Sequence, residues 1–221
     1  AQTGGLFYVG VALELGHLSA HQMRELGRIS MTYGNNDMRL TVWQNPLILG
    51  VPEENIAAVE AELRAIGLSS DASSFAAGAV ACTGKWACNF ALAYTKADAL
   101  SIVRHLQAKY SLDSPINIHL TGCPNSCAQH YIGDIGLVGA IAPGGVEGYN
   151  IVLGGGSDQD QGLARPLCGP VPSDAVNDIL DHVVGRYIAS RAPGQTFLAY
   201  TRGLSDEALQ DLMPQEFAIA S

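Results

Sequence analysis

Cysteines are the residues of this chain with the clearest capacity for chemistry, because four of the five fall into two close pairs. Five residues separate Cys82 from Cys88 in VACTGKWACNF, and three separate Cys123 from Cys127 in IHLTGCPNSCAQH. Each pair stands where an apolar, strand-like run gives way to a loop, so loops that leave neighbouring strands can bring the four thiols together. A disulfide framework normally has more cysteines in a shorter secreted chain. The spacing therefore favours metal ligation by reduced thiols.

Thiolates suit either zinc or an iron–sulfur cluster, so the loop lengths must separate the two. Structural zinc sites usually have about two to four residues between paired ligands, and the gap between Cys82 and Cys88 is wider. A [4Fe–4S] cube is larger than one ion and accommodates such a loop, and Gly84 and Gly122 let backbone N–H groups approach its sulfurs. The two pairs are therefore predicted to bind a [4Fe–4S] cluster, and buried core thiols are the less favoured interpretation. The fifth cysteine, Cys168, has no partner at ligand spacing and is predicted to be a small buried residue.

The cysteine motifs resemble the cluster-binding motifs of the sirohaem-dependent nitrite/sulfite reductase family. CTGKWAC and TGCPNSC carry the resemblance, and RLTVWQN at 39–45 is similar to a second motif of that family, in the small domain before the cluster domain. The resemblance spans nearly the whole chain and is closest to the C-terminal half of an assimilatory nitrite reductase. It implies two cofactors, a [4Fe–4S] cluster and sirohaem, and it implies that Cys127 bridges the cluster to the sirohaem iron.

The resemblance also implies contacts between this chain and the carboxylates of sirohaem, which guanidinium and amide donors are suited to bind. The candidate cofactor-binding residues are Arg39, Thr41, Gln44, Asn45, Asn125, Cys127 and Gln129. Without the resemblance, the segment 39–45 is interpreted as a polar strand edge and turn, and Asn125 as a residue that shapes its loop. His130 is predicted to be structural, because the family uses a cysteine as the iron ligand. The catalytic residues stay unknown, because the family's anion-binding Arg and Lys residues lie in its first half.

The function that the resemblance implies is the six-electron reduction of nitrite to ammonia by an oxidoreductase, with the cluster passing electrons to sirohaem. The alternatives are a sulfite reductase, a precorrin-processing relative and a non-catalytic iron–sulfur electron-transfer module. Because the sequence resembles only the second half of the family, activity is expected to need the N-terminal half as a partner. The electron donor is expected to be a ferredoxin or an NAD(P)H-dependent flavoprotein.

Hydrophobic periodicity predicts how the chain presents these residues, beginning with a ferredoxin-like half-domain at 1–70. Its predicted elements are a strand from Leu6 to Leu13, a helix that Ser19 caps and Gly34 ends, strands near Met38–Val42 and Leu47–Leu49, and a helix through Ile56 and Ile66 that Gly67 closes. The following segment, LSSDASSFAAGA, is small, polar and without period. It predicts a domain boundary.

Residues 75–221 are predicted to form the sirohaem and [4Fe–4S] cluster-binding domain. The predicted strands lead into Cys82 and cover 116–120, 135–141 and 149–154, and the predicted helices cover 96–110, 176–183, 195–201 and 205–212. Strands and helices thus occur in both domains. The predicted fold class is α+β, with mixed α/β sheets.

Charge and hydropathy exclude some partners. The net charge is −9 and the 12 Lys and Arg residues are scattered, which argues against a nucleic acid or an anionic membrane as partner. No run approaches the roughly 18 apolar residues of a membrane span, and the first residues lack the basic segment of a signal peptide. The expected location is the cytoplasm.

Overall fold

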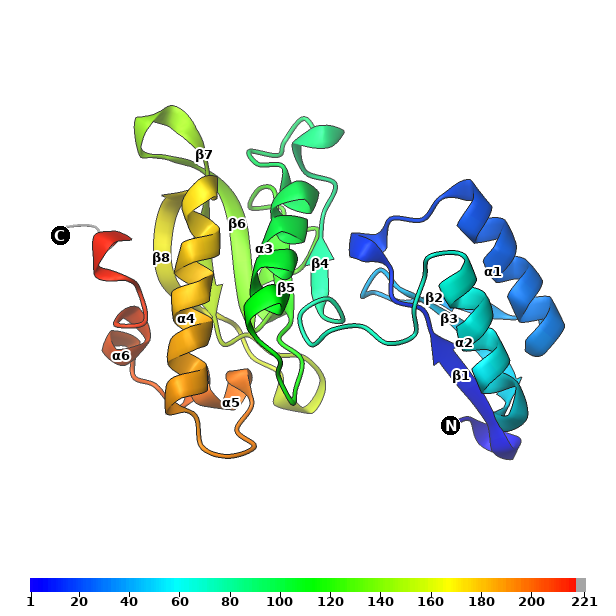
Figure 1. Ribbon diagram of the computed structural model, residues 1–221. Coiled ribbons are helices and arrows are strands. Elements are labelled where there is room, and N and C mark those ends of the chain that lie inside the picture. Colours follow the sequence, from blue (N-terminus) through cyan, green and yellow to red (C-terminus); the bar gives the residue numbers. More distant parts are fainter. Residues whose placement is uncertain (218–221) are drawn as a thin grey trace.

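Two sheets, each with its own helices, make up the two parts of the molecule (Figure 1). The computed structural model describes residues 1–217. The N-terminal part contains β1 (Leu6–Gly10), α1 (Ala20–Tyr33), β2 (Met38–Leu40), β3 (Pro46–Pro52) and α2 (Ile56–Ala65). Its strands form an antiparallel sheet in the order β1-β3-β2, and α1 and α2 pack together beside it. The predicted βαββα order is therefore confirmed.

Helix α1 shows how the sequence specifies these elements. The Ser19 hydroxyl accepts a hydrogen bond from the Gln22 N–H at 3.2 Å, and the Gln22 side chain accepts one from the Ser19 N–H at 3.0 Å. This reciprocal cap satisfies two N–H groups that the first helical turn would leave without partners. The apolar face of the helix then buries Leu26 and Ile29 in a core that also contains Ile48 of β3.

The strand predicted at 38–42 is shorter than expected. β2 ends at Leu40, because the chain turns at 41–45, where the Thr41 N–H donates to the Asn45 carbonyl at 2.9 Å. Gln44 adopts the left-handed conformation with a φ of 60°, which closes the turn. The turn directs the Gln44 side chain to the Ala81 carbonyl at the end of β4.

The C-terminal part contains β4 (Ala79–Ala81), α3 (Thr95–Lys109), β5 (Ile118–Thr121), β6 (Ile135–Ala142), β7 (Val146–Leu153), β8 (Arg165–Pro172), α4 (Val176–Ser190), α5 (Phe197–Arg202) and α6 (Asp206–Gln210). The five strands lie side by side in chain order, with β4, β5 and β6 parallel and β6, β7 and β8 antiparallel. Helices α3 and α4 lie next to each other over this sheet (Figure 1). The α+β class with mixed sheets is confirmed.

The parallel strands β4 and β5 are buried along their whole length, as strands covered on both faces must be. Because they are parallel neighbours, their carboxyl ends meet at one edge of the sheet. Cys82 follows β4 directly, and Cys123 follows β5 after one glycine. The sheet topology therefore brings the two cysteine loops to the same edge.

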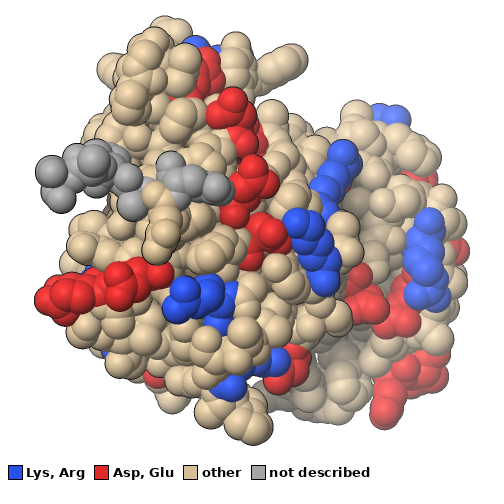
Figure 2. Space-filling view, turned by 60° about the vertical axis from the view of Figure 1, so that its left-hand side comes forward, with Lys and Arg blue, Asp and Glu red and all other residues tan. Residues whose placement is uncertain are grey.

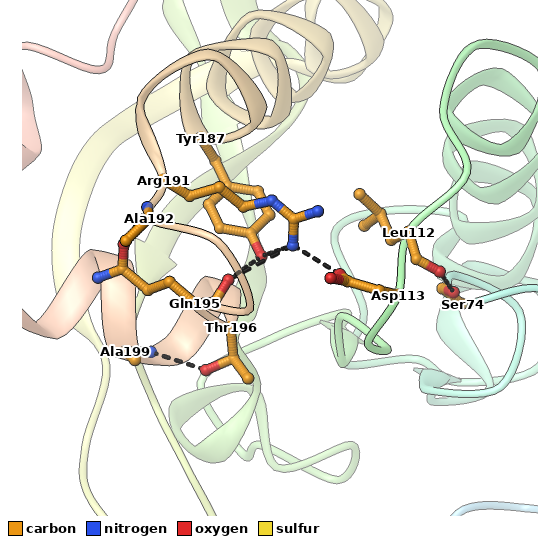
Figure 3. A network of polar contacts seen from close by, with 9 residues as sticks. All are labelled: Ser74, Leu112, Asp113, Tyr187, Arg191, Ala192, Gln195, Thr196 and Ala199. Carbon is orange, nitrogen blue, oxygen red and sulfur yellow. Dashed lines mark hydrogen bonds and ion pairs between the residues drawn. The ribbon is translucent and has the colours of Figure 1, made fainter.

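A polar network holds the end of α4 against the loop that leads into β5 (Figure 3). The Arg191 guanidinium donates to Asp113 at 2.6 Å and to the Tyr187 hydroxyl at 2.9 Å. The same hydroxyl donates to the Gln195 carbonyl at 2.6 Å, and Arg191 lies over the Tyr187 ring at 5.1 Å from its centroid. The network thus fixes the loop at Asp113, five residues before β5 begins.

The surface carries charges of both signs. Figure 2 shows Lys and Arg side chains separated by acidic and uncharged residues, without one broad basic patch on the face in view. Within residues 1–217, none of the helices has both the length and the apolar character that crossing a membrane requires.

Candidate metal centre

The first cysteine is held by backbone and side-chain hydrogen bonds where β4 ends. The Gly122 N–H donates to the Cys82 sulfur at 3.1 Å, and the Cys82 N–H donates to the Leu120 carbonyl at 3.0 Å. The Thr95 hydroxyl donates to the Cys82 carbonyl at 2.7 Å and lies 3.7 Å from the sulfur. An N–H group that points at a thiolate stabilises its negative charge. The position of Cys82 at the end of β4 is thereby fixed by three hydrogen bonds.

The loop from Gly84 to Leu92 packs directly against the residue that precedes Cys123. The Leu92 N–H donates to the Gly122 carbonyl at 2.7 Å, and a Cβ added at Gly122 would lie 2.7 Å from the Ala91 Cβ. This loop contains Cys88, whose N–H donates to the Gly84 carbonyl at 3.1 Å. Glycine at 122 therefore permits the close approach of the two cysteine loops.

The second cysteine loop turns sharply between its two cysteines and just after them. Ser126 and Gln129 both adopt the left-handed conformation, with φ values of 58° and 54°. The Thr121 hydroxyl accepts the Ala128 N–H at 3.2 Å, which ties the loop back to β5. Cys123 is buried and Cys127 is exposed. The loop thus places one thiol inside the domain and the other at its surface.

His119 fixes the same loop from the core of the sheet. Its Nδ1 lies 3.1 Å from the Gln129 carbonyl, which can only accept, so Nδ1 carries the hydrogen. Burial holds the pKa of His119 below its usual value, so the ring stays neutral. Its ring meets Trp43 of the 39–45 turn edge-on, with 5.3 Å between centroids. The RLTVWQN segment and the second cysteine loop are therefore coupled through one side chain.

The family follows from comparison with known proteins. The sequence profile described as "Nitrite/Sulfite reductase ferredoxin-like half domain" matches residues 1–66, and that described as "Nitrite and sulphite reductase 4Fe-4S domain" matches residues 74–195. The chain belongs to the nitrite/sulfite reductase family. This confirms the resemblance found in CTGKWAC, TGCPNSC and RLTVWQN. All four cysteines of the first two motifs lie within the matched 4Fe-4S domain.

The chain is similar both to proteins named as nitrite reductases and to proteins named as sulfite reductases. A ferredoxin–nitrite reductase of Synechococcus elongatus is 38% identical over 80% of the chain and 35% of its own length. Sulfite reductase [ferredoxin] 1 of Mycolicibacterium paratuberculosis is 33% identical over 93% of the chain and 39% of its own length. The structure of the NirA protein of Mycobacterium tuberculosis matches with a TM-score of 0.84 at 33% identity, over 94% of the chain and 40% of that protein. The chain thus spans between a third and two fifths of these relatives.

Nitrite/sulfite reductases carry a [4Fe–4S] cluster and sirohaem, as the resemblance implied. The residues present fit a cluster in three respects: four unpaired thiols on two adjoining loops, an N–H donor to one sulfur, and a glycine where the loops touch. In the described part of the chain, no group of three His, Cys, Asp or Glu side chains is placed to hold a single metal ion. Ligands at the corners of a cluster are spaced more widely than the ligands of one ion, so a cluster does not require such a group.

The polar residues of RLTVWQN in this nitrite/sulfite reductase chain differ from one another in burial and in hydrogen-bond partners. The Gln44 side-chain amide donates to the Ala81 carbonyl at 2.9 Å, and its oxygen is buried without a partner among the described residues. The Thr41 hydroxyl donates to the Asn45 carbonyl at 2.8 Å, and the Asn45 side-chain oxygen accepts the Leu13 N–H at 2.8 Å. Arg39 is exposed and pairs with Asp37 at 2.8 Å. Gln44 therefore reaches the end of β4, at the residue that precedes Cys82.

The polar residues beside Cys127 lie at the surface. Asn125 and Gln129 are exposed. His130 is half-buried, and its Nδ1 lies 2.8 Å from the Ser126 hydroxyl. The Asn125 and Gln129 side chains are thus accessible to solvent near the exposed Cys127.

Sequence reasoning missed Thr95, Lys96 and His119, all of which contact the cysteine loops or their strands. One signal was present for Lys96. A cation in the first turn of a helix opposes the helix dipole, so its position needs another explanation.

The glycine run at 154–156 has a structural reason. A Cβ at Gly155 would lie 2.6 Å from the Gly133 and Tyr131 carbonyls.

Asp134 joins the start of β6 to β5 and gives a prediction for stability. Its carboxylate accepts the Asn117 N–H at 2.7 Å, and burial raises the pKa of Asp134 to about 6, against the attraction of Arg202. A carboxyl with a raised folded pKa binds its proton more tightly when folded, so its contribution falls as the pH rises from about 4 to 6. Asp134→Asn keeps the acceptor and removes the charge. The variant is expected to gain roughly 2 kcal/mol relative to wild type between pH 4 and pH 7.

Urea unfolding of both proteins at several pH values measures this difference. A free-energy difference that stays constant from pH 4 to pH 7 would show that Asp134 titrates normally.

Proposed function

We propose that this chain forms the cluster-binding half of a sirohaem-dependent nitrite reductase, which carries out the six-electron reduction of nitrite to ammonia. The observation that carries the proposal is the meeting of the two cysteine loops at the carboxyl ends of the parallel strands β4 and β5. The preference for nitrite rests on relatives: ferredoxin–nitrite reductases of Synechococcus elongatus and Zea mays are each 38% identical to the chain.

In this proposal, Cys82, Cys88, Cys123 and Cys127 would hold the [4Fe–4S] cluster, and Cys127 would also hold the sirohaem. When bound, the two cofactors supply the stepwise electron transfer to the anion. The chain's own residues position the ligands. The Gly122 N–H stabilises the charge on the Cys82 sulfur, and the left-handed residues beside Cys127 present its thiol at the surface.

The polar residues of RLTVWQN and of the second loop are proposed to bind the sirohaem carboxylates. They are Arg39, Thr41, Gln44, Asn45, Asn125 and Gln129. Arg39, Asn125 and Gln129 are the exposed members of this set. An exposed ion pair contributes little to stability, so Arg39 can exchange Asp37 for a macrocycle carboxylate at small cost.

A sulfite reductase is the second candidate, because sulfite reductase [ferredoxin] 1 of Mycolicibacterium paratuberculosis aligns with 93% of the chain, compared with 80% for the Synechococcus elongatus nitrite reductase. The electron donor is proposed to be a ferredoxin, which the names of these relatives include. A cytoplasmic location is proposed because cluster ligation needs reduced thiols. The proposed partner is the N-terminal half of the enzyme, which this chain does not include.

The test uses the full-length protein, purified anaerobically. Iron, acid-labile sulfide and zinc analysis, together with a visible spectrum, are expected to show iron, sulfide and a porphyrin band. With reduced viologen as donor, ammonia from nitrite is expected to form faster than sulfide from sulfite. Zinc without porphyrin absorption would favour a structural or electron-transfer module, and faster sulfide formation would favour the sulfite reductase.

Arg39 provides a test of the sirohaem contacts. A charged hydrogen bond to a carboxylate contributes about 1.5–3 kcal/mol. In the full-length protein, Arg39→Leu is therefore expected to weaken sirohaem retention by about ten- to a hundredfold and to leave the cluster in place. Arg39→Lys should rescue only part of this loss, since it keeps the charge and loses the planar fork.

The measurement is porphyrin absorbance per cluster after gel filtration. If Arg39→Leu keeps the wild-type ratio, Arg39 is a surface residue whose only partner is Asp37.

A further inference from the structure

A lysine that the proposed function leaves unused lies behind the first cysteine. Lys96 is the second residue of α3, and its Nζ donates to the Leu15 carbonyl at 2.6 Å and to the Ala81 carbonyl at 3.2 Å. Ala81 directly precedes Cys82. The ammonium group is therefore fixed at the base of the first cysteine loop by two backbone acceptors.

These contacts link both parts of the molecule to this loop. The Ala81 carbonyl also accepts the Gln44 side-chain amide at 2.9 Å, so it receives donors from the N-terminal part and from α3. Leu15 lies between β1 and α1 in the sequence and packs into the core of the C-terminal part. Lys96 and Leu15 also line a cleft of about 490 Å³, together with Trp86 of the first cysteine loop. A cation in this position is held by the tertiary structure and not by its own helix.

The electrostatic surroundings of Lys96 are unusual for a lysine on a helix. Its side chain is half-buried, and burial lowers the pKa of Lys96 while attraction to Cys82 opposes that change. The other basic side chains of α3 are engaged elsewhere: Arg104 pairs with Glu14 at 2.9 Å, and Lys109 pairs with Asp181 at 3.0 Å. In contrast, the Lys96 ammonium donates to two neutral backbone carbonyls, and within residues 1–217 it forms no ion pair with a carboxylate.

We propose that Lys96 is a positioning residue that raises the reduction potential of the [4Fe–4S] cluster through its fixed charge beside Cys82. The inference rests on the proposed cluster ligands. Reduction adds one electron, and hence one negative charge, to the cluster. A cation held nearby in a partly buried site stabilises the reduced state more than the oxidised one. An effect on the order of tenfold in the equilibrium constant corresponds to about 59 mV for a one-electron couple.

The test compares three variants of the full-length protein. Lys96→Met removes the charge and keeps the side-chain length, and Lys96→Arg keeps the charge. Lys109→Met is the matched control, because it removes one positive charge from the other end of the same helix, about 20 Å away. The cluster potential is measured by anaerobic redox titration with dithionite, followed by electron paramagnetic resonance of the reduced cluster.

The expected result is a potential about 59 mV lower in Lys96→Met, with Lys96→Arg and Lys109→Met close to wild type. An unchanged potential in Lys96→Met overturns the inference, and so does an equal shift in Lys109→Met, which would assign the effect to net charge. If Lys96→Met assembles no cluster, Lys96→Gln is titrated in its place. Failure of both neutral variants to assemble a cluster would make Lys96 purely structural and would also overturn the inference. Absence of iron and sulfide from the wild-type protein would instead contradict the proposed function.

Discussion

Replacing any one of Cys82, Cys88, Cys123 and Cys127 with alanine is expected to remove the cluster almost completely. Each thiolate would hold one corner of the cube, and the loops that carry the two pairs are fixed against each other at Gly122. An alanine leaves one iron without its protein ligand and with no side chain that can replace it. Iron and acid-labile sulfide, measured per mole of purified protein, give the cluster content directly.

Cys168→Ala is the control for this series. Cys168 is half-buried on β8, where it packs against the core of the C-terminal part, and burial raises the pKa of its thiol to about 11. A thiol that resists ionisation is a poor metal ligand. The variant is expected to keep the full cluster content. Full content in Cys82→Ala, or loss in Cys168→Ala, would contradict the ligand assignment.

The second large effect is expected for Gly122→Ala, although the substitution adds only one methyl group. The new Cβ would lie 2.7 Å from the Ala91 Cβ, so the two cysteine loops must move apart. Overpacking of this kind costs about 1–3 kcal/mol, and every 1.4 kcal/mol is about tenfold in an equilibrium. We expect Gly122→Ala to lose cluster content by about tenfold or more while the chain remains folded.

Gly27→Ala is the matched control, because a Cβ at Gly27 of α1 meets nothing within 4 Å. It should stabilise the protein by about 0.5–1 kcal/mol through helix propensity and leave the cluster content unchanged. Circular dichroism melting and iron analysis of both variants separate a folding defect from a ligand-site defect. Wild-type iron content in Gly122→Ala would show that the close approach of the loops is not required.

The sequence predicted those features that have local signals. The Ser19 cap and the apolar spacing of Leu26 and Ile29 specify α1, and both are found in the structure. The apolar runs before Cys82 and Cys123 correctly predicted strands, and two strands that end beside each other explain how pairs far apart in the chain can meet. Spacing and strand position thus sufficed to predict where the cysteine loops lie.

Contacts between distant side chains and backbone carbonyls were not predictable in this way. Lys96 bonds to Leu15, and His119 bonds to Gln129 and contacts Trp43, yet none of these pairs leaves a periodic pattern. The end of β2 at Leu40 was missed for a related reason. Gln44 adopts a left-handed conformation, which glutamine rarely does and which the sequence therefore did not predict. Its side-chain amide donates a hydrogen bond to the Ala81 carbonyl.

The parallel pairing of β4 and β5 has a consequence for the order of assembly. These strands are separated by the whole of α3, so they can pair only after a long stretch of chain has closed on itself. Non-local contacts of this kind form slowly during folding. Until they form, the four cysteines that we propose as cluster ligands remain in two separate pairs. Delivery of iron and sulfide to the newly made polypeptide should therefore be productive only after this half of the sheet has folded.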